Sequence, residues 1–259
     1  MGQVMNKILV VENNIIPFDN SDDIIIDNNT IRFIKNGDYC IEYIDSNDVS
    51  YNIELEENIC INLFEYSNNK EFNVNNRYSL NNNSSLIVSK FYANDNTNEK
   101  INIYLKEDKA NIKYNFSSIS SDDDKYIINI YHEGKKTSSD IFNRTVAKKD
   151  SSNIFDINSY VDNGIKDCYL KQETKIITLG DSNNKINPNM FIGEDTTTAV
   201  HSSVIGSINE DDLFYMMSRG INYKDSINLI TKGMILSNIN ANIEYREKIL
   251  KILDNIGGE

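Results

Sequence analysis

Apolar and polar residues alternate along the first two thirds of the chain. Residues 51–55 and 101–105 place an apolar side chain at every second position, which is the period of a half-buried β-strand. No apolar stripe with a helical period appears before about residue 208. A series of short strands without intervening helices predicts an all-β body.

A repeat sharpens this prediction. Leu55, Leu80 and Leu105 lie 25 residues apart, and each ends a short alternating segment and precedes a polar turn. Five positions after each leucine comes a small residue that we expect to open the next strand: Cys60, Ser85 and Ala110. Units of this length favour a β-solenoid, in which each coil buries its apolar face on the next. A meander or sandwich with coincidental spacing is the alternative that the residues leave open.

The periodicity changes near residue 208. Asn209 can cap a helix, Leu213, Phe214 and Met217 form its apolar stripe, and Gly220 ends it. A second helix is predicted from about Asn222, and a third ends at residues 257–258. We therefore expect an N-terminal segment (1–38), a β core (39–207) and a small C-terminal helical subdomain (208–259).

Composition excludes several classes of function. The 259 residues carry a formal net charge of −13, which argues against nucleic acid and anionic membranes, because both bind basic surfaces. The longest apolar runs are far shorter than the roughly 20 residues of a membrane-spanning helix, and no secretory signal is recognisable. We expect a cytoplasmic protein with neither a nucleic-acid nor a membrane partner.

Candidate chemistry is sparse. Three scattered cysteines and two histidines form no disulfide framework and no conventional zinc spacing. His132 lies on a predicted strand, where a structural role is expected, and a buried apolar role is expected for Cys168. The acidic run at 120–125 lacks the glycine and glutamate of an EF-hand loop and predicts a solvated turn. Phosphate-binding and nucleophile-elbow motifs are absent.

Two late segments carry a resemblance. Residues 201–206 read HSSVIG and residues 213–221 read LFYMMSRGI. With the Asn-Pro strand at 187–188, they resemble the SufB/SufD family of iron–sulfur cluster assembly proteins, whose motifs read approximately HGATVG and LFYLRSRGI. With weaker similarity upstream, such as the stretch that follows His132, the match covers about residues 125–256 in order, and more loosely the chain from about residue 40.

The resemblance implies a right-handed parallel β-helix with helical ends. It also implies pairing with a SufB-like partner or with a second copy. A SufC-like ABC ATPase would dock on the C-terminal helices and drive remodelling of the paired β-helices. Tyr215, Arg219 and Gly220 would contribute to that docking surface, whereas Leu213 and Phe214 are expected in the core of the helical subdomain.

His201 matches the family histidine at the partner interface. It is a candidate ligand of a metal or cluster, with interface packing as the alternative. Ser202 replaces the glycine of the family motif, and no cysteine follows Cys168. Since clusters require thiolates, for which imidazole sometimes substitutes, these departures favour a SufD-like member over a SufB-type scaffold. We expect no cofactor held stably by the isolated chain, with a transient cluster in the complex.

The leading hypothesis is a non-enzymatic, SufD-like subunit of an iron–sulfur assembly complex. A β-helix enzyme acting on polysaccharide is one alternative, because the acidic composition permits the paired carboxylates that such chemistry needs. A degenerate β-solenoid interaction module is another, and Ser202 is compatible with it.

Overall fold

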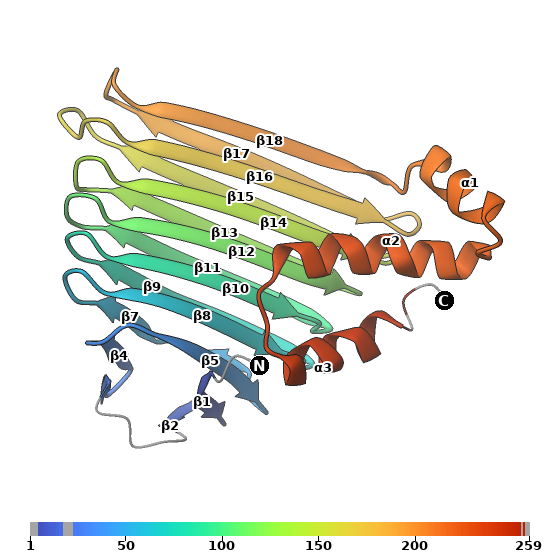
Figure 1. Cartoon of the computed structure of the whole chain (residues 1–259), viewed down its shortest axis with the longest axis horizontal. Coiled ribbons are helices and arrows are strands. Elements are labelled where there is room, and N and C mark those ends of the chain that lie inside the picture. The colour runs from blue at the N-terminus through green and yellow to red at the C-terminus, as the bar shows by residue number, and fades with distance from the viewer. Residues whose placement is uncertain (1–4, 18–22, 255, 257–259) are drawn as a thin grey trace.

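Two β-sheets face each other along the length of the molecule (Figure 1). The computed structural model describes residues 5–17, 23–254 and 256. Sheet A runs in the order β18-β16-β14-β12-β10-β8-β5-β1-β2, and sheet B in the order β17-β15-β13-β11-β9-β7-β4-β3, with β6 paired to β9. The chain alternates between the sheets from β7 onward, so each coil contributes one strand to each sheet.

The strands of sheet A are β1 (Asn6–Val11), β2 (Asn14–Pro17), β5 (Gly37–Ile44), β8 (Cys60–Ser67), β10 (Ser85–Tyr92), β12 (Asn111–Ser120), β14 (Ser138–Ala147), β16 (Tyr169–Thr178) and β18 (Thr198–Ser207). Those of sheet B are β3 (Ile24–Asp27), β4 (Thr30–Phe33), β6 (Asp48–Val49), β7 (Asn52–Leu55), β9 (Glu71–Leu80), β11 (Asn96–Leu105), β13 (Asp123–His132), β15 (Ser152–Val161) and β17 (Asn183–Ile192).

Parallel pairing between successive coils confirms the predicted solenoid. Leu55 pairs with Leu80, and Leu80 with Leu105, across β7, β9 and β11. The leucine repeat is therefore one stacked column of the β-helix, whereas a meander would pair its strands antiparallel. Only the hairpins β1-β2 and β3-β4 are antiparallel among the described pairs. Since β1 pairs with β5 and β4 with β7, strands before residue 39 extend both sheets.

The small residues after each leucine match the strand starts in two of three coils. Cys60 opens β8 and pairs with Ser85, which opens β10. The next coil is one residue longer, because Ser85 pairs with Asn111. β12 therefore begins at Asn111, and the prediction that Ala110 opens it is wrong by one position.

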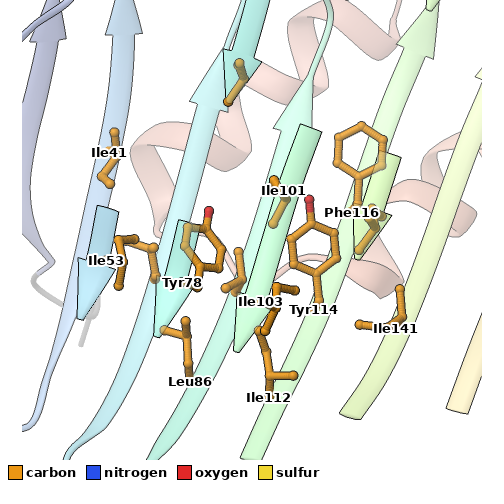
Figure 2. Packing of buried hydrophobic residues seen from close by; sticks show 14 of the residues in the cluster. Ile41, Ile53, Tyr78, Leu86, Ile101, Ile103, Ile112, Tyr114, Phe116 and Ile141 are labelled. Carbon is orange, nitrogen blue, oxygen red and sulfur yellow. The ribbon is translucent and has the colours of Figure 1, made fainter. Parts of the chain in front are cut away.

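The space between the sheets is filled by the inward side chains of both (Figure 2). On β11, Ile101, Ile103 and Leu105 are buried, while Asn102 and Tyr104 between them reach the surface. This is the alternation that the sequence shows, because successive strand residues point to opposite faces. Burial of each apolar face on the neighbouring coil stabilises the column.

Three helices follow the last strand: α1 (Glu210–Ser218), α2 (Tyr223–Asn238) and α3 (Ile243–Leu253). The side chains of Asn209, Asn222 and Asn242 accept hydrogen bonds from backbone N–H groups of the first turns, which confirms the predicted starts at Asn209 and Asn222. α3 ends at Leu253 with Asp254 as its C-cap, so the prediction that the third helix ends at residues 257–258 is wrong, because the helix stops earlier. Among the described helices, none combines the length and apolar character needed to cross a bilayer.

Helices α2 and α3 cover part of the outer face of sheet A (Figure 1). Tyr245, Ile249 and Leu253 of α3 pack with Phe64 and Phe91, which point outward from β8 and β10. The ring centroids of Phe64 and Tyr245 lie 5.2 Å apart. These strands are apolar on both faces because one faces the core and the other faces a helix.

The acidic run at 120–125 is a tight corner between β12 and β13. Asp122 and Asp123 are exposed, but Asp124 is buried, because β13 alternates inward from that position. The prediction of a solvated turn is therefore wrong for Asp124. Burial raises the pKa of this carboxyl group to about 7, against the opposing effect of hydrogen bonds from Ser120, Thr97 and Tyr126. No group of three or more His, Cys, Asp or Glu among residues 5–17, 23–254 and 256 could hold a metal ion.

Candidate functional site

The last coil of the β-helix is open on one side. β17 pairs only with β15 and β18 only with β16, so both are edge strands of their sheets in the described structure. Each presents a row of backbone N–H and C=O groups without a neighbouring strand, which is a template for pairing with another chain. We call β17 and β18 together the terminal rung.

Side chains of the terminal rung are exposed where the equivalent ones below are buried. Leu170 and Ile176 of β16 have no exposed surface, but Ile205, which pairs with Ile176, is 45% exposed. The large apolar side chains exposed on the rung are Phe191, Ile192, Val200, Val204 and Ile205. Adjacent exposed apolar residues of this kind mark a surface for another protein.

His201 lies within this rung. It is exposed and pairs in register with Gln172 of β16, which is buried inside the β-helix. Because residues in register on parallel neighbours point to the same face, the His201 side chain belongs to the inward column, at the open end. The family resemblance implied a cluster ligand or an interface residue at this position, and in the described structure His201 lies on an edge strand of sheet A.

Two side-chain ladders run along the outer face of sheet B and end at the terminal rung. The rings of Tyr104, Tyr131, Tyr160 and Phe191 stack with successive centroid distances of 4.8, 4.9 and 4.9 Å. The guanidinium of Arg77 covers the first ring at 4.2 Å, whereas Phe191 at the other end is 54% exposed.

The second ladder consists of amides. Asn129 donates to Asn102, Asn158 to Asn129 and Asn189 to Asn158, at 2.9–3.0 Å. Each Nδ2 therefore points to the preceding coil, and the Oδ1 of Asn189 is left at the open end. Both ladders are columns that a further strand would continue.

Helix α1 carries the second exposed apolar surface. Phe214, Tyr215 and Met217 are 76%, 58% and 48% exposed, and no residue of α1 is buried. The Arg219 guanidinium lies 5.2 Å from the centre of the Tyr215 ring. Gly220 follows with a φ of +86°, as expected of a helix C-terminus. We call these residues the α1 surface.

The exposure of Phe214 corrects the sequence-based expectation that it would lie in the core of the helical subdomain. The apolar stripe was identified correctly, but α1 projects beyond sheet A and contacts α2 without burying any of its own residues (Figure 1). Tyr215, Arg219 and Gly220 are exposed. They lie on a different element from His201, so the predicted residues fall on two surfaces.

His132 and Cys168 are structural, as expected. His132 is buried and contacts the hydroxyls of Thr137 and Ser139 at 2.8 and 3.0 Å. Burial lowers the pKa of its imidazole to about 3, so the ring is neutral. Cys168 is buried with Val161 and Leu170 beneath the terminal rung, and its Sγ lies 3.2 Å from Thr137 Oγ1.

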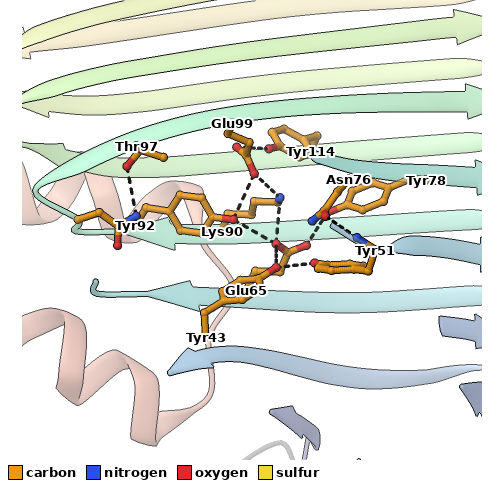
Figure 3. Close-up of polar contacts among 11 residues, drawn as sticks. Tyr43, Tyr51, Glu65, Asn76, Tyr78, Lys90, Tyr92, Thr97, Glu99 and Tyr114 are labelled. Atoms are coloured by element: carbon orange, nitrogen blue, oxygen red, sulfur yellow. Dashed lines mark hydrogen bonds and ion pairs between the residues drawn. The ribbon is translucent and has the colours of Figure 1, made fainter. Parts of the chain in front are cut away.

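A charged cluster inside the β-helix was not predicted. Figure 3 shows Lys90 between Glu65 and Glu99, at 2.9 and 3.0 Å from their carboxylate oxygens, with all three side chains buried. Tyrosine hydroxyls complete the cluster: Tyr43 and Tyr78 donate to Glu65, and Tyr92 donates to both carboxylates. Burial raises the pKa of Glu99 above its usual value.

A sequence signal for this cluster existed. Leu86 and Val88 set the inward phase of β10, and Lys90 continues that phase. Glu65 follows Leu63 on β8 in the same way. A charged residue at a phased inward position requires a buried partner of opposite charge. The alternation is enough to place Lys90 and Glu65 at inward positions, but only the stacking of coils shows that they meet.

The fold and the exposed surfaces define the chain as a parallel β-helix protein with a helical C-terminal end and an open, apolar terminal rung. A family model described as the SUF system FeS cluster assembly SufBD core domain matches residues 52–234. Because this covers most of the chain, the protein belongs to that family. The predicted SufB/SufD membership and its SufD-like character are thereby confirmed.

A curated relative agrees with this assignment. The chain is 28% identical over 118 residues to the iron–sulfur cluster assembly protein SufD of Bacillus subtilis (strain 168). That match covers 45% of this chain and 27% of the relative. The matched part therefore spans about a quarter of the relative's length.

Proposed function

We propose that this chain is a non-enzymatic, SufD-like subunit of a SUF-type iron–sulfur cluster assembly complex. It pairs with a SufB/SufD-type partner through the terminal rung and docks a SufC-like ABC ATPase through its C-terminal helices. The observation that carries the proposal is the open terminal rung with His201 at its edge, within the span that matches the SufBD core domain.

The terminal rung supports pairing by strand addition. Two edge strands of ten residues each offer main-chain hydrogen bonds, and the exposed apolar side chains supply area that pairing removes from water. The ladders that end at Asn189 and Phe191 add side-chain stacking to the same junction.

His201 supports a role in building the cluster at this junction. The sequence has no cysteine after Cys168, and Cys168 is buried beneath the rung. Thiolate ligands for a cluster at the terminal rung therefore come from the partner, and His201 adds an imidazole, which iron accepts in place of thiolate. The cluster is the product of the complex, and the isolated chain holds none stably.

The α1 surface supports ATPase docking. Phe214, Tyr215 and Met217 form an uncovered patch beside a cation, Arg219. Exposed aromatic residues and arginine are the side chains that most often dominate binding at protein interfaces. Helices α2 and α3 are held on sheet A instead and anchor this patch to the β-helix.

The test is co-purification of the full chain with the organism's SufC-like ATPase, sized by light scattering. We expect a stable complex that Phe214→Asp weakens at least tenfold. Ile243→Asp is the matched control, because Ile243 is exposed and apolar but lies at the start of α3. Deletion of residues 208–259 is a poorer test, since it would uncover Phe64 and Phe91. Absence of a complex at micromolar concentration, with and without a SufB-like partner, would contradict the proposal.

Pairing through the terminal rung is tested separately with a SufB-like partner. Val204→Lys places a charge on the edge strand β18, and we expect it to reduce formation of the heterodimer. Ile87→Lys is the control, because Ile87 is an exposed apolar residue of β10, far from the rung. Equal heterodimer yields for the two variants would place the interface elsewhere.

A further inference from the structure

Gln172 lies directly beneath His201. The two residues pair in register on β16 and β18. Leu170, Gln172, Thr174 and Ile176 are the alternating buried positions of β16, so the Gln172 side chain points into the β-helix, and His201 occupies the same column one coil later. Gln172 is 2% exposed.

The orientation of the Gln172 amide is fixed by its partners. Its Nε2 donates to Ser159 Oγ at 2.8 Å and to the backbone oxygen of Asn189 at 3.3 Å. A backbone carbonyl only accepts hydrogen bonds, so the amide nitrogen must face it. The Oε1 atom is therefore turned away from Asn189, and it is buried without a hydrogen-bond partner.

A buried acceptor without a donor is unfavourable and rare in folded proteins. Ser159 lies on β15 and Asn189 on β17, so both partners of Nε2 belong to sheet B, and a donor to Oε1 is available from β18, the next strand of sheet A after β16. His201 is the residue in register there, and a neutral imidazole carries one N–H group and one lone pair. Ser159, which Gln172 contacts across the β-helix, pairs in register with Met190 of β17, so the inward residue of sheet B at this level is a thioether, which is a poor acceptor for that proton.

We propose that Gln172 is a positioning residue for His201: the imidazole donates its N–H to Gln172 Oε1. This contact fixes one tautomer and directs the lone pair of the other nitrogen out of the open end. Histidines that bind metals commonly donate their second ring nitrogen to a carbonyl or carboxylate in this way. The functional meaning of this contact rests on the proposed role of His201 in the cluster. Whether the contact forms does not depend on that role.

The test needs neither iron nor a partner. Nitrogen-15 NMR of the full chain, at a pH where imidazole is neutral, reports which ring nitrogen carries the proton. The chain has only two histidines, and buried His132 serves as the internal reference. We expect a single tautomer for His201. A mixture of both tautomers in the wild-type chain, as in a solvent-exposed imidazole, would overturn the proposal without any variant.

Substitutions then assign the contact. In Gln172→Met the acceptor is removed at similar volume, and His201 is expected to become a tautomer mixture while the His132 signals stay unchanged. Ser159→Ala is the matched control, since it removes a partner of Nε2 and leaves Oε1 in place. A single tautomer in Gln172→Met would overturn the proposal.

These outcomes are distinct from failure of the proposed function. A single His201 tautomer in a chain that binds neither ATPase nor SufB-like partner would leave the contact established and the assembly role rejected. A tautomer mixture in a chain that assembles normally would reject only the contact with Gln172.

Discussion

Lys90 and Glu65 form an ion pair inside the β-helix, with 2.9 Å between Nζ and Oε2 and no exposed surface on either side chain. They are stacked in register on β10 and β8. Glu99 approaches from sheet B, so one ammonium serves two carboxyl groups. Desolvation of such charges is compensated only while each retains its partners.

Removal of the shared cation should therefore be costly. Lys90→Met leaves two buried carboxyl groups without a counter-charge, and we expect a loss of about 3–5 kcal/mol in the free energy of unfolding. The measurement is urea denaturation. The loss should be smaller at acidic pH, where both carboxyl groups can protonate. Lys100→Met, at an exposed position, should change stability by less than about 0.5 kcal/mol.

Asp124 should make stability fall as pH rises. Burial raises its pKa from 3.8 to about 7, so the native state binds its proton more tightly than the unfolded state does. Its contribution to stability is complete below pH 4 and declines up to pH 7, by about 4 kcal/mol. The Asp124→Asn variant lacks this decline. Between pH 4 and pH 7 the stability of the variant relative to the wild-type protein is therefore expected to rise. The exposed control Asp122→Asn should keep the wild-type profile; identical profiles for both variants would contradict this account.

Docking of α3 should weaken in acid. Glu42 of β5 accepts hydrogen bonds from Tyr245 and Lys248 of α3 at 2.8 and 2.7 Å, and Lys7 pairs with it from β1 at 2.5 Å. Burial alone would raise the pKa of Glu42, but the hydrogen bonds from Lys248, Lys7 and Tyr245 outweigh it and lower the pKa. The stabilisation of α3 docking by the Glu42 carboxylate is therefore complete above the unfolded-state pKa of this group. It is lost as the pH falls through the folded-state pKa.

Hydrogen exchange of the α3 amides measures this docking. Glu42→Gln should accelerate exchange in α3 at neutral pH and remove its acid dependence, while exchange in β11 and β13 stays unchanged. Glu244→Gln is the control, because that carboxyl group also contacts Lys248 but is more than half exposed. Equal acceleration in the two variants would show that Glu42 has no special role.

Arg219 should contribute to ATPase binding by charge. Arg219→Glu reverses the cation beside Tyr215, and we expect at least a tenfold weaker complex in a calorimetric titration, with an unchanged circular dichroism spectrum. Arg246→Glu makes the same charge change at an exposed position of α3 and should bind as wild type does. Unchanged binding of Arg219→Glu would remove this residue from the docking surface.

His201 should matter for cluster yield and not for pairing. His201→Ala, assembled with a SufB-like partner and reconstituted with iron and sulfide, is expected to form the heterodimer but to hold less cluster by iron content and visible absorbance. Ser203→Ala, at the next inward position of β18, is the matched control. A full yield in His201→Ala would leave interface packing as the role of this histidine.

Local patterns of residues were enough to predict the elements of the chain that depend on periodicity. Alternation identified the strands, the spacing of Leu55, Leu80 and Leu105 identified the coil, and Asn209 and Asn222 identified the helix starts. These are short-range properties, since side-chain direction along a strand and capping at a helix end depend on adjacent residues. The motifs at 201–206 and 213–221 were enough to identify the family.

Tertiary structure decided which of these residues are covered. Phe214 lies on a correctly predicted helical stripe, yet it is exposed, because the contact of α1 with α2 leaves every residue of α1 unburied. His201 and Gln172 stand on adjacent strands, but one is open to solvent and the other buried, because no coil follows β18. Lys90 meets Glu65 through the register of two coils and Glu99 through the approach of the opposite sheet. Periodicity fixes the direction of a side chain, whereas its neighbours depend on turn lengths and on where the stack ends, and both are properties of the assembled chain.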